Sequence, residues 1–221
     1  MTAQTVKQSP FQATEKSLTM PGVNVMLMGP AGTGKTHSIG TAVDAGVEVF
    51  YFGLENGLEA LKGYWTDRGQ PIPDNLHWHI LKAPSLSFLD MQESARKINT
   101  LSLESLAKMT DPDRGKHNQF IEVYSVLNNF VDQRTGKAYG TVLDWKSDRL
   151  LAIDGMTGLS NAALSLVTGG KPVRSQSDWG IAQVELEKLL RKLCDDCPCH
   201  LVVLAHVERE VDPVLGGVKI M

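Results

Sequence analysis

The residues with the clearest chemistry lie in one run, "GPAGTGKT", which extends from Gly29 to Thr36. The run matches the pattern G-x-x-x-x-G-K-[ST], and it lies between an apolar strand and a helix, as that pattern requires. Its glycines let backbone N–H groups turn inward around a phosphate, and the helix N-terminus adds partial positive charge. The sequence therefore predicts a site for the phosphates of ATP or ADP. The residues expected to hold the nucleotide are Gly29, Pro30, Ala31, Gly32, Thr33, Gly34, Lys35, Thr36 and His37.

Two side chains of this run and one distant acid are expected to complete the phosphate site. We expect Lys35 to reach the β- and γ-phosphates and Thr36 to give its hydroxyl to Mg²⁺. Asp154, the acid that ends the apolar run "LLAID", is the expected partner on the Mg²⁺ side. The next residue is Gly155, although many nucleotide-driven motors place a glutamate there to activate the attacking water. Either the protein binds nucleotide without hydrolysing it, or its base lies elsewhere in the chain.

A base for water attack must reach the γ-phosphate from the carboxyl edge of the sheet, so candidates lie at strand ends. Apart from Asp154, Glu55 is the only carboxylate that directly follows an apolar strand, and its alternative is a surface acid in a strand–helix turn. His206 ends the last apolar strand, "HLVVLAH", where a polar side chain can sense the γ-phosphate by a hydrogen bond. Its alternative is a histidine satisfied at a strand end. We therefore assign catalysis to Glu55, Lys35 and His206.

Strands and helices alternate along the chain, and together they must position these residues. Apolar runs predict strands at 23–29, 47–54, 76–83, 149–154 and 200–206. Helices are expected at 35–46, at 87–108 with a break, at 119–133 and at 178–196, the last capped by Ser177 or Asp178. Residues 207–221 are typical of a polar loop with little structure. The alternation predicts an α/β fold in three layers, with a mainly parallel sheet covered by helices on both faces.

The composition is that of an ordinary soluble protein, with 42% apolar and 21% charged residues. The 221 residues suffice for one α/β domain, predicted at 21–221 behind a flexible N-terminal arm at 1–20. The sequence stops at Met221 without a terminal helix or polar tail, which leaves a C-terminal truncation open. No apolar run approaches the roughly 20 residues of a membrane span, and no signal-peptide core is present, so we expect a cytoplasmic protein.

Three cysteines lie close together in "CDDCPCH", at Cys194, Cys197 and Cys199, and His200 follows them. These ligand types would suit zinc, but structural zinc sites usually have two separated ligand pairs. The run also lies where a long helix turns into an apolar strand, which commits half of it to sheet geometry. We therefore favour small buried thiols at a helix–strand joint and keep zinc as the alternative.

The order of four segments resembles the RecA/RadA core ATPases, most closely the phage-encoded RecA-like proteins of the Sak class, which act in single-strand annealing and recombination. The resemblance covers about residues 22–221 and rests on "GPAGTGKT", "FYFGLENGLEAL", "LLAIDGMTGLS" and "LVVLAHVEREVDPVLGGVKIM". It implies a P-loop NTPase fold of the RecA-like kind. It also implies that Glu55 is the catalytic glutamate, that a small residue follows the Mg²⁺ acid Asp154, and that His206 is the polar sensor.

The resemblance further implies that two loops hold single-stranded DNA. By position the first is 168–177, with Lys171 and Arg174 for phosphates and Trp179 near its end. The second is about 208–217, where Arg209 is a cation within a net acidic stretch that suits phosphates poorly. With a net charge of −3, DNA contacts must come from such local basic residues, and the alternative for the first loop is a solvated flexible segment.

The resemblance also implies a homo-oligomer, either a ring or a filament, with a single-strand-binding protein as a further partner. RadA-type proteins clasp their neighbours through a Phe-x-x-Ala element, and "PFQAT" departs from it by one residue, so Phe11 is offered as an arm anchor. The leading function is a Mg²⁺-dependent, DNA-dependent ATPase of phage-type recombination or annealing, in the host cytoplasm if phage-encoded. The alternatives are a nucleotide-gated mediator with little hydrolysis and a small-molecule phosphotransferase. For adenine, only sequence position suggests Lys62 and Tyr64.

Overall fold

The computed structural model of the chain is built around one five-stranded sheet. It describes residues 22–82, 87–108, 117–169, 171, 174–207, 209–211 and 218–220. The predicted arm and Phe11 lie outside these residues. Every pairing in the sheet is parallel, and the order is β1-β5-β4-β2-β3. The strands are β1 Asn24–Gly29, β2 Glu48–Gly53, β3 Leu76–Ile80, β4 Arg149–Asp154 and β5 His200–His206.

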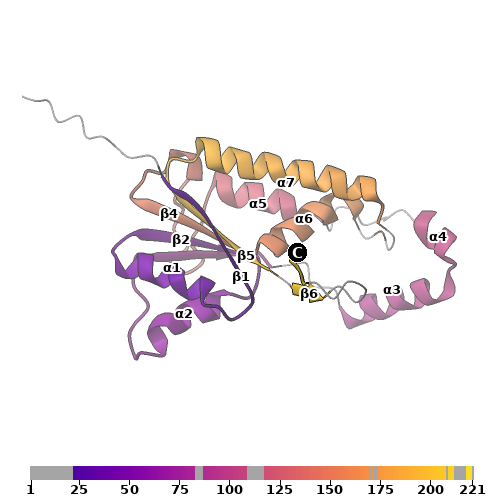
Figure 1. The fold of residues 1–221 in the computed structure, drawn as a ribbon, viewed down its shortest axis with the longest axis horizontal. Helices are drawn as coiled ribbons and strands as arrows, with labels where there is room; N and C mark the ends of the chain where they lie inside the picture. The colour runs from indigo at the N-terminus through magenta and orange to yellow at the C-terminus, as the bar shows by residue number, and fades with distance from the viewer. Residues whose placement is uncertain are drawn as a thin grey trace, which may run out of the picture.

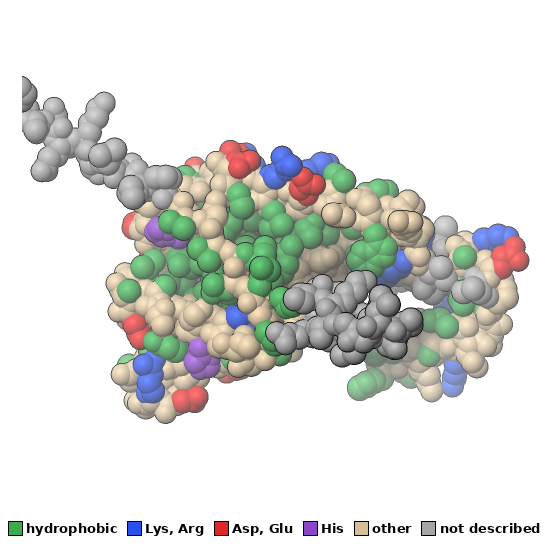
Figure 2. Space-filling model, in the orientation of Figure 1, with side chains coloured by type: hydrophobic (Ala, Val, Ile, Leu, Met, Phe, Trp, Pro, Cys, Tyr) green, Lys and Arg blue, Asp and Glu red, His purple; other side chains and the backbone are tan. Residues whose placement is uncertain are grey.

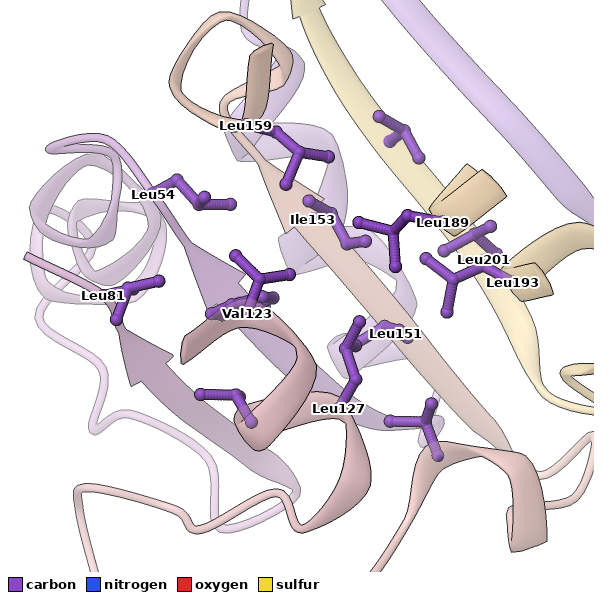
Figure 3. Packing of buried hydrophobic residues seen from close by; sticks show 14 of the residues in the cluster. Leu54, Leu81, Val123, Leu127, Leu151, Ile153, Leu159, Leu189, Leu193 and Leu201 are labelled. Carbon is purple, nitrogen blue, oxygen red and sulfur yellow. The ribbon is translucent and has the colours of Figure 1, made fainter. Parts of the chain in front are cut away.

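Helices cover both faces of this sheet (Figure 1). On one face lie α1 Lys35–Asp44 and α2 Leu58–Thr66, and on the other lie α5 Gln119–Asn128, α6 Met156–Thr168 and α7 Gln176–Asp196. Successive residues of a strand point to opposite faces. Tyr51 therefore joins the cluster under α1 and α2, whereas Phe52 joins the cluster under α5, α6 and α7. Figure 3 shows the second cluster, in which Ile153 of β4 lies near Leu159 and Leu189, and Leu151 of the same strand lies near Leu127. The predicted α/β fold with a parallel sheet is confirmed.

Two helices were not predicted from the sequence, namely α2 and α6. The apolar stripe of α6 consists of Leu159, Ala162, Ala163 and Leu166, at the three- and four-residue steps of a helix. Two of these four side chains are alanines and the helix carries Gly158, so the hydrophobic pattern is weak in the sequence. The stripe is identified by the burial of Leu159, Ala162 and Ala163 on a helix that packs against α5, α7 and β5.

Other boundaries differ from prediction for local reasons. The expected helix at 87–108 is broken, as anticipated, into α3 Phe88–Thr100 and α4 Leu103–Lys108. The expected helix at 119–133 was too long, because after Asn128 the chain forms a turn closed by a bridge between Val131 and Ala138. A short 3₁₀ turn, η2 Val142–Asp144, leads on to β4.

The ends of two other predicted segments also need correction. The N-cap of α7 is Ser175 rather than Ser177 or Asp178: its hydroxyl accepts from the Asp178 N–H, and the Asp178 carboxylate accepts from the Ser175 N–H at 2.8 Å. The expectation of little structure over 207–221 was wrong in part. Two short antiparallel strands are present there, β6 Arg209–Val211 and β7 Val218–Ile220.

Candidate active site

The predicted site residues lie at the carboxyl edge of the sheet, and the strand register brings them together. Gly29 at the end of β1 lies beside His206 at the end of β5. Gly53 at the end of β2 lies beside Asp154 at the end of β4. The N–H of Leu54, the residue after β2, donates to the Asp154 carbonyl at 2.9 Å. Because β5 and β4 are neighbours, the ends of four strands form one continuous row.

The phosphate loop leads from β1 directly into α1. The first turn of α1 has no side-chain cap, so its N–H groups stay free for an anion. The Lys35 ammonium is folded back onto the loop, where it donates to the carbonyls of Gly29 at 2.7 Å and of Pro30 at 2.8 Å. The Thr33 hydroxyl also donates to the Pro30 carbonyl, at 2.9 Å. These bonds hold the loop in a curled shape, with a cation beside the place expected for phosphate.

Thr36 and Asp154 meet as the sequence predicts for a Mg²⁺ site. The Thr36 hydroxyl donates to the Asp154 carboxylate at 3.1 Å, and the carboxylate is almost fully buried. Hydroxyl and carboxylate oxygens are ligands that Mg²⁺ accepts, with phosphates and waters completing its shell. Among the described residues no group of three His, Cys, Asp or Glu side chains could hold a metal ion by itself. The two oxygen donors of the pair are of the kind that would hold Mg²⁺.

Tyr51 is a site residue that the sequence analysis missed. Its hydroxyl donates to the same carboxylate oxygen of Asp154 at 2.5 Å. Burial and the neighbouring Asp154 charge raise the pKa of Tyr51, so the phenol keeps its proton and remains a donor. The only signal in the sequence was one hydroxyl-bearing ring within the apolar run "VFYFG". Gly57 also contacts this acid, because a Cβ there would lie 2.2 Å from the Asp154 carboxylate.

Glu55 lies beside Gly155 and the first turn of α6. Its carboxylate accepts from the Gly158 N–H at 3.0 Å, and 30% of its side chain is exposed. Gly155 has a φ of 115°, and a Cβ at this position would lie 2.8 Å from Cγ of Glu55. The glycine that follows Asp154 therefore makes room for Glu55, the carboxylate that the sequence analysis proposed as the base.

His206 lies between Lys35 and Glu55. Its Nδ1 is 3.4 Å from the Lys35 ammonium, and its Nε2 is 3.5 Å from the Glu55 carboxylate. An ammonium only donates and an ionised carboxylate only accepts. A neutral imidazole satisfies both neighbours when Nδ1 accepts and the proton is on Nε2. The three residues assigned to catalysis therefore form one polar chain, Lys35 to His206 to Glu55.

The candidate adenine residues lie on the α1–α2 side. The His37 ring is exposed and lies 5.9 Å from the Tyr64 ring, edge to face. The Tyr64 hydroxyl donates to Asp44 at 2.9 Å, so this ring is fixed against α1. Lys62 instead pairs with Glu59 on α2, and its ammonium lies over the Trp78 ring of β3. Its charge is therefore directed toward α2 and β3.

Two of the candidate DNA residues, Lys171 and Arg174, precede α7, which extends past the carboxyl ends of the strands (Figure 1). Lys171 is half-buried and Arg174 is exposed. Trp179 is 48% exposed and lines a shallow pocket with Ser160 and Gln183. Arg209 is on β6, but its side chain and the residues 208 and 212–217 of the second loop lie outside the described part of the chain.

The cysteine run lies at the amino end of β5, away from the phosphate loop. Cys194 is exposed, whereas Cys197 and Cys199 are buried with their Sγ atoms 3.2 Å apart. Cys197 Sγ lies 3.3 Å from the Val142 carbonyl, and the His200 Nδ1 accepts from the Val23 N–H at 3.1 Å. His200 thus holds the start of β1, and the two buried thiols fill the helix–strand joint.

No protein-family model matches the chain, and no curated protein matches it either. Among solved structures, it is similar to the assembled ATPase EscN in complex with its central stalk EscO, from the type III secretion system of enteropathogenic E. coli. That alignment has 13% identity and a TM-score of 0.40, and it covers 90% of this chain but 45% of the other. A likeness this distant carries no argument about function. Across the described residues, no helix is long and apolar enough to cross a membrane.

Proposed function

We propose that this chain is a P-loop ATPase of the RecA-like class that binds ATP at residues 29–37 and hydrolyses it with Mg²⁺. The observation that carries the proposal is the convergence of Lys35, Glu55, Asp154 and His206 on one edge of the sheet, next to an uncapped helix N-terminus. Each of them has a partner that suits its proposed role.

The proposed cycle begins when Lys35 leaves the loop carbonyls for the phosphates. The ammonium is attracted to an ionised phosphate by opposite charge, which a neutral carbonyl does not offer, so this exchange favours the bound state. Thr36 and Asp154 would hold Mg²⁺, which would supply positive charge beside the phosphates. Glu55 accepts the proton of the attacking water. His206 contacts both Glu55 and Lys35. A movement of Lys35 toward bound phosphate would therefore change the contacts that position Glu55.

We propose that ATP hydrolysis by this chain acts on single-stranded DNA, in phage-type recombination or annealing. Lys171 and Arg174 would bind backbone phosphates, and the exposed Trp179 ring offers a surface on which a base can stack. The formal net charge of −3 makes such a local cluster necessary. The proposal includes a ring or filament of copies in the cytoplasm, with Phe11 as a contact between copies. It also includes Arg209 as a DNA contact and a single-strand-binding protein as a further partner.

The test is ATP turnover with and without single-stranded DNA, for the wild type, Glu55→Gln and Glu59→Gln. Glu59 is the matched control, an exposed acid on α2 that pairs with Lys62. Turnover that rises with DNA, vanishes in Glu55→Gln and persists in Glu59→Gln supports the proposal. ATP binding without turnover in every variant would instead favour the nucleotide-gated mediator. Phosphate transferred to a small-molecule acceptor rather than to water would favour the phosphotransferase. Normal hydrolysis by Glu55→Gln would refute the assignment of the base.

A further inference from the structure

Two of the three cysteines form a contact pair at the joint between α7 and β5. The Sγ atoms of Cys197 and Cys199 are 3.2 Å apart, and both residues are buried. Pro198 is the one residue between them, and its ring fixes φ in the short chain that links the two side chains. The Cys197 Sγ also lies 3.3 Å from the Val142 carbonyl. The two thiols therefore share one small space, and a reaction at one sulfur takes place beside the other.

The two thiols differ in a way that suits successive steps of one reaction. The hydrogen bond from the Cys199 thiol lowers the pKa of Cys197, whereas the same contact and burial raise the pKa of Cys199. Cys197 keeps 8% of its surface exposed, and Cys199 keeps none. The thiolate is the nucleophilic form of cysteine. A small oxidant therefore meets Cys197 first, and Cys199 is placed to react second.

The geometry favours a bond between the two sulfurs over a zinc ion between them. Two sulfur ligands of tetrahedral zinc, each at about 2.3 Å from the metal, stand about 3.8 Å apart, which is farther than this pair. The neighbouring His200 uses its Nδ1 to accept from the Val23 N–H. Across the described residues, no three side chains of the metal-binding kinds are grouped for a metal ion. A disulfide requires the sulfurs to close to about 2.05 Å, a movement of about 1 Å.

We propose that Cys197 and Cys199 are a reversible redox pair, which a peroxide oxidises to a disulfide and a small dithiol reduces again. The Cys197 thiolate attacks one oxygen of hydrogen peroxide: an S–O bond forms, the O–O bond breaks, and the hydroxide that leaves takes up the proton from Cys197. The Cys199 sulfur then attacks the sulfenic sulfur: the S–S bond forms, the S–O bond breaks, and the second hydroxide takes the Cys199 proton. Two electrons pass from the thiols to the peroxide, and two waters form. A dithiol reverses the reaction by thiol–disulfide exchange and leaves as a cyclic disulfide.

The pair lies where the start of β1 is held. The Pro198 carbonyl, between the two cysteines, accepts from the Gly22 N–H at 3.1 Å. A Cβ on residue 22 would lie 1.9 Å from the Cys199 carbonyl oxygen, so the two backbones pack directly on each other. Because the linking chain is only three residues long, closing the disulfide ring moves the peptide units inside it. The carbonyl that holds Gly22 belongs to one of these units, so oxidation is expected to loosen that bond.

The strand β1 depends on such backbone bonds because its side chains are poorly covered. Met26 and Met28 are 47% and 66% exposed, and Figure 2 shows hydrophobic side chains gathered along this strand on the face in view. Packing therefore contributes little to its attachment, and a change at its first residues is felt along a strand that ends at Gly29. The redox pair and its effect on Gly22 do not rest on the proposed ATPase activity.

The first test uses Cys194→Ser, which removes the exposed thiol and leaves the pair. Hydrogen peroxide should remove both remaining thiols together and lower the mass of the single chain by two hydrogen atoms, and dithiothreitol should restore both. With Cys199→Ala added, the Cys197 sulfenic acid has no partner and should be trapped by dimedone. With Cys197→Ala added instead, the remaining thiol should react about tenfold more slowly than the pair. Circular dichroism checks that each variant is folded, and the central measurement needs only the exposed substitution.

Hydrogen exchange measures the effect on β1. Oxidation of Cys194→Ser should speed exchange of the Gly22 amide by up to about tenfold, and reduction should reverse the change. The control is the Val49 amide, which donates to the Asn75 carbonyl at the start of β2 and should not respond. The proposal is overturned if the pair stays reduced at a peroxide dose that oxidises Cys194 in the wild type. A disulfide between two chains, or unchanged exchange at Gly22 after oxidation, would overturn it as well.

Discussion

The Gly155→Ala variant tests whether the glycine after Asp154 exists to accommodate Glu55. Two separate effects are expected. A side chain at a φ of 115° costs about 1–3 kcal/mol of stability. For a chain of this size that corresponds to a fall of roughly 2–12 °C in Tm. The added Cβ would also lie 2.8 Å from Cγ of Glu55, and that flexible side chain can yield more easily than the backbone.

The second effect falls on catalysis. A displacement of about 1 Å at a catalytic group can cost about 100-fold in rate, so kcat should fall about that much while ATP affinity stays near that of the wild type. The assay is steady-state ATP turnover, with nucleotide affinity measured by calorimetry. The control is Gly180→Ala on α7, where a Cβ meets nothing within 4 Å. There we expect unchanged turnover and slightly higher stability, because alanine favours a helix.

The double variant decides whether the loss acts through Glu55. If Gly155→Ala slows turnover by displacing that carboxylate, then adding it to Glu55→Gln should slow turnover no further, because the two changes remove one function. Turnover of Gly155→Ala within twofold of the wild type would refute the reasoning. An additional loss in the double variant would also refute it, since the glycine would then serve some other group.

Three further outcomes follow from other contacts. Tyr51→Phe removes a donor to the buried Asp154 carboxylate, a bond worth about 1.5–3 kcal/mol, so the Mg²⁺ concentration for half-maximal turnover should shift at least several-fold and urea unfolding should show a loss of stability of that order. Lys171→Ala with Arg174→Ala should weaken single-stranded DNA binding and reduce its salt slope by about 1.4, and an unchanged slope would exclude these cations as contacts. Burial alone would raise the pKa of Asp132, but hydrogen bonds from backbone N–H groups and the Thr135 hydroxyl outweigh it and lower the pKa below 3.8. The stability from this carboxylate is therefore present at neutral pH and lost as pH falls below 3.8, and urea unfolding should show a flatter acid limb for Asp132→Asn.

The sequence was informative about the site because parallel strands share one carboxyl edge. Once Gly29, Glu55, Asp154 and His206 were placed at the ends of apolar runs, their position on one edge followed from the parallel sheet, whereas the distances between them depend on the strand order. The contacts that depend on register could not be inferred this way. Tyr51 lies inside β2, and whether its hydroxyl reaches Asp154 depends on β2 pairing with β4, which the sequence does not encode locally.

The missed helix α6 has a related cause. Two of the four residues of its apolar stripe are alanines, which are buried in the core without giving a strong hydrophobic signal. The predicted helix at 119–133 extends past Asn128, the true end of α5, for a different reason. Phe130 is apolar and buried, and it extends the apparent helical pattern, but it belongs to a turn fixed by Asp132 and Gln133 against β3. A hydrophobic pattern reports burial, and burial in a turn resembles burial in a helix.

Asp154 and Glu55 each fit because a glycine follows the neighbouring strand. Asp154 at the end of β4 fits because residue 57, after β2, is glycine, where a Cβ would lie 2.2 Å from the carboxylate. Glu55 after β2 fits because residue 155, after β4, is also glycine. A glutamate directly after Asp154 would occupy the space that Glu55 now fills. The absence of an acid at 155 and the presence of one at 55 are therefore one structural feature, in which the proposed base and the proposed metal ligand follow neighbouring strands and each strand end leaves space for the other's carboxylate.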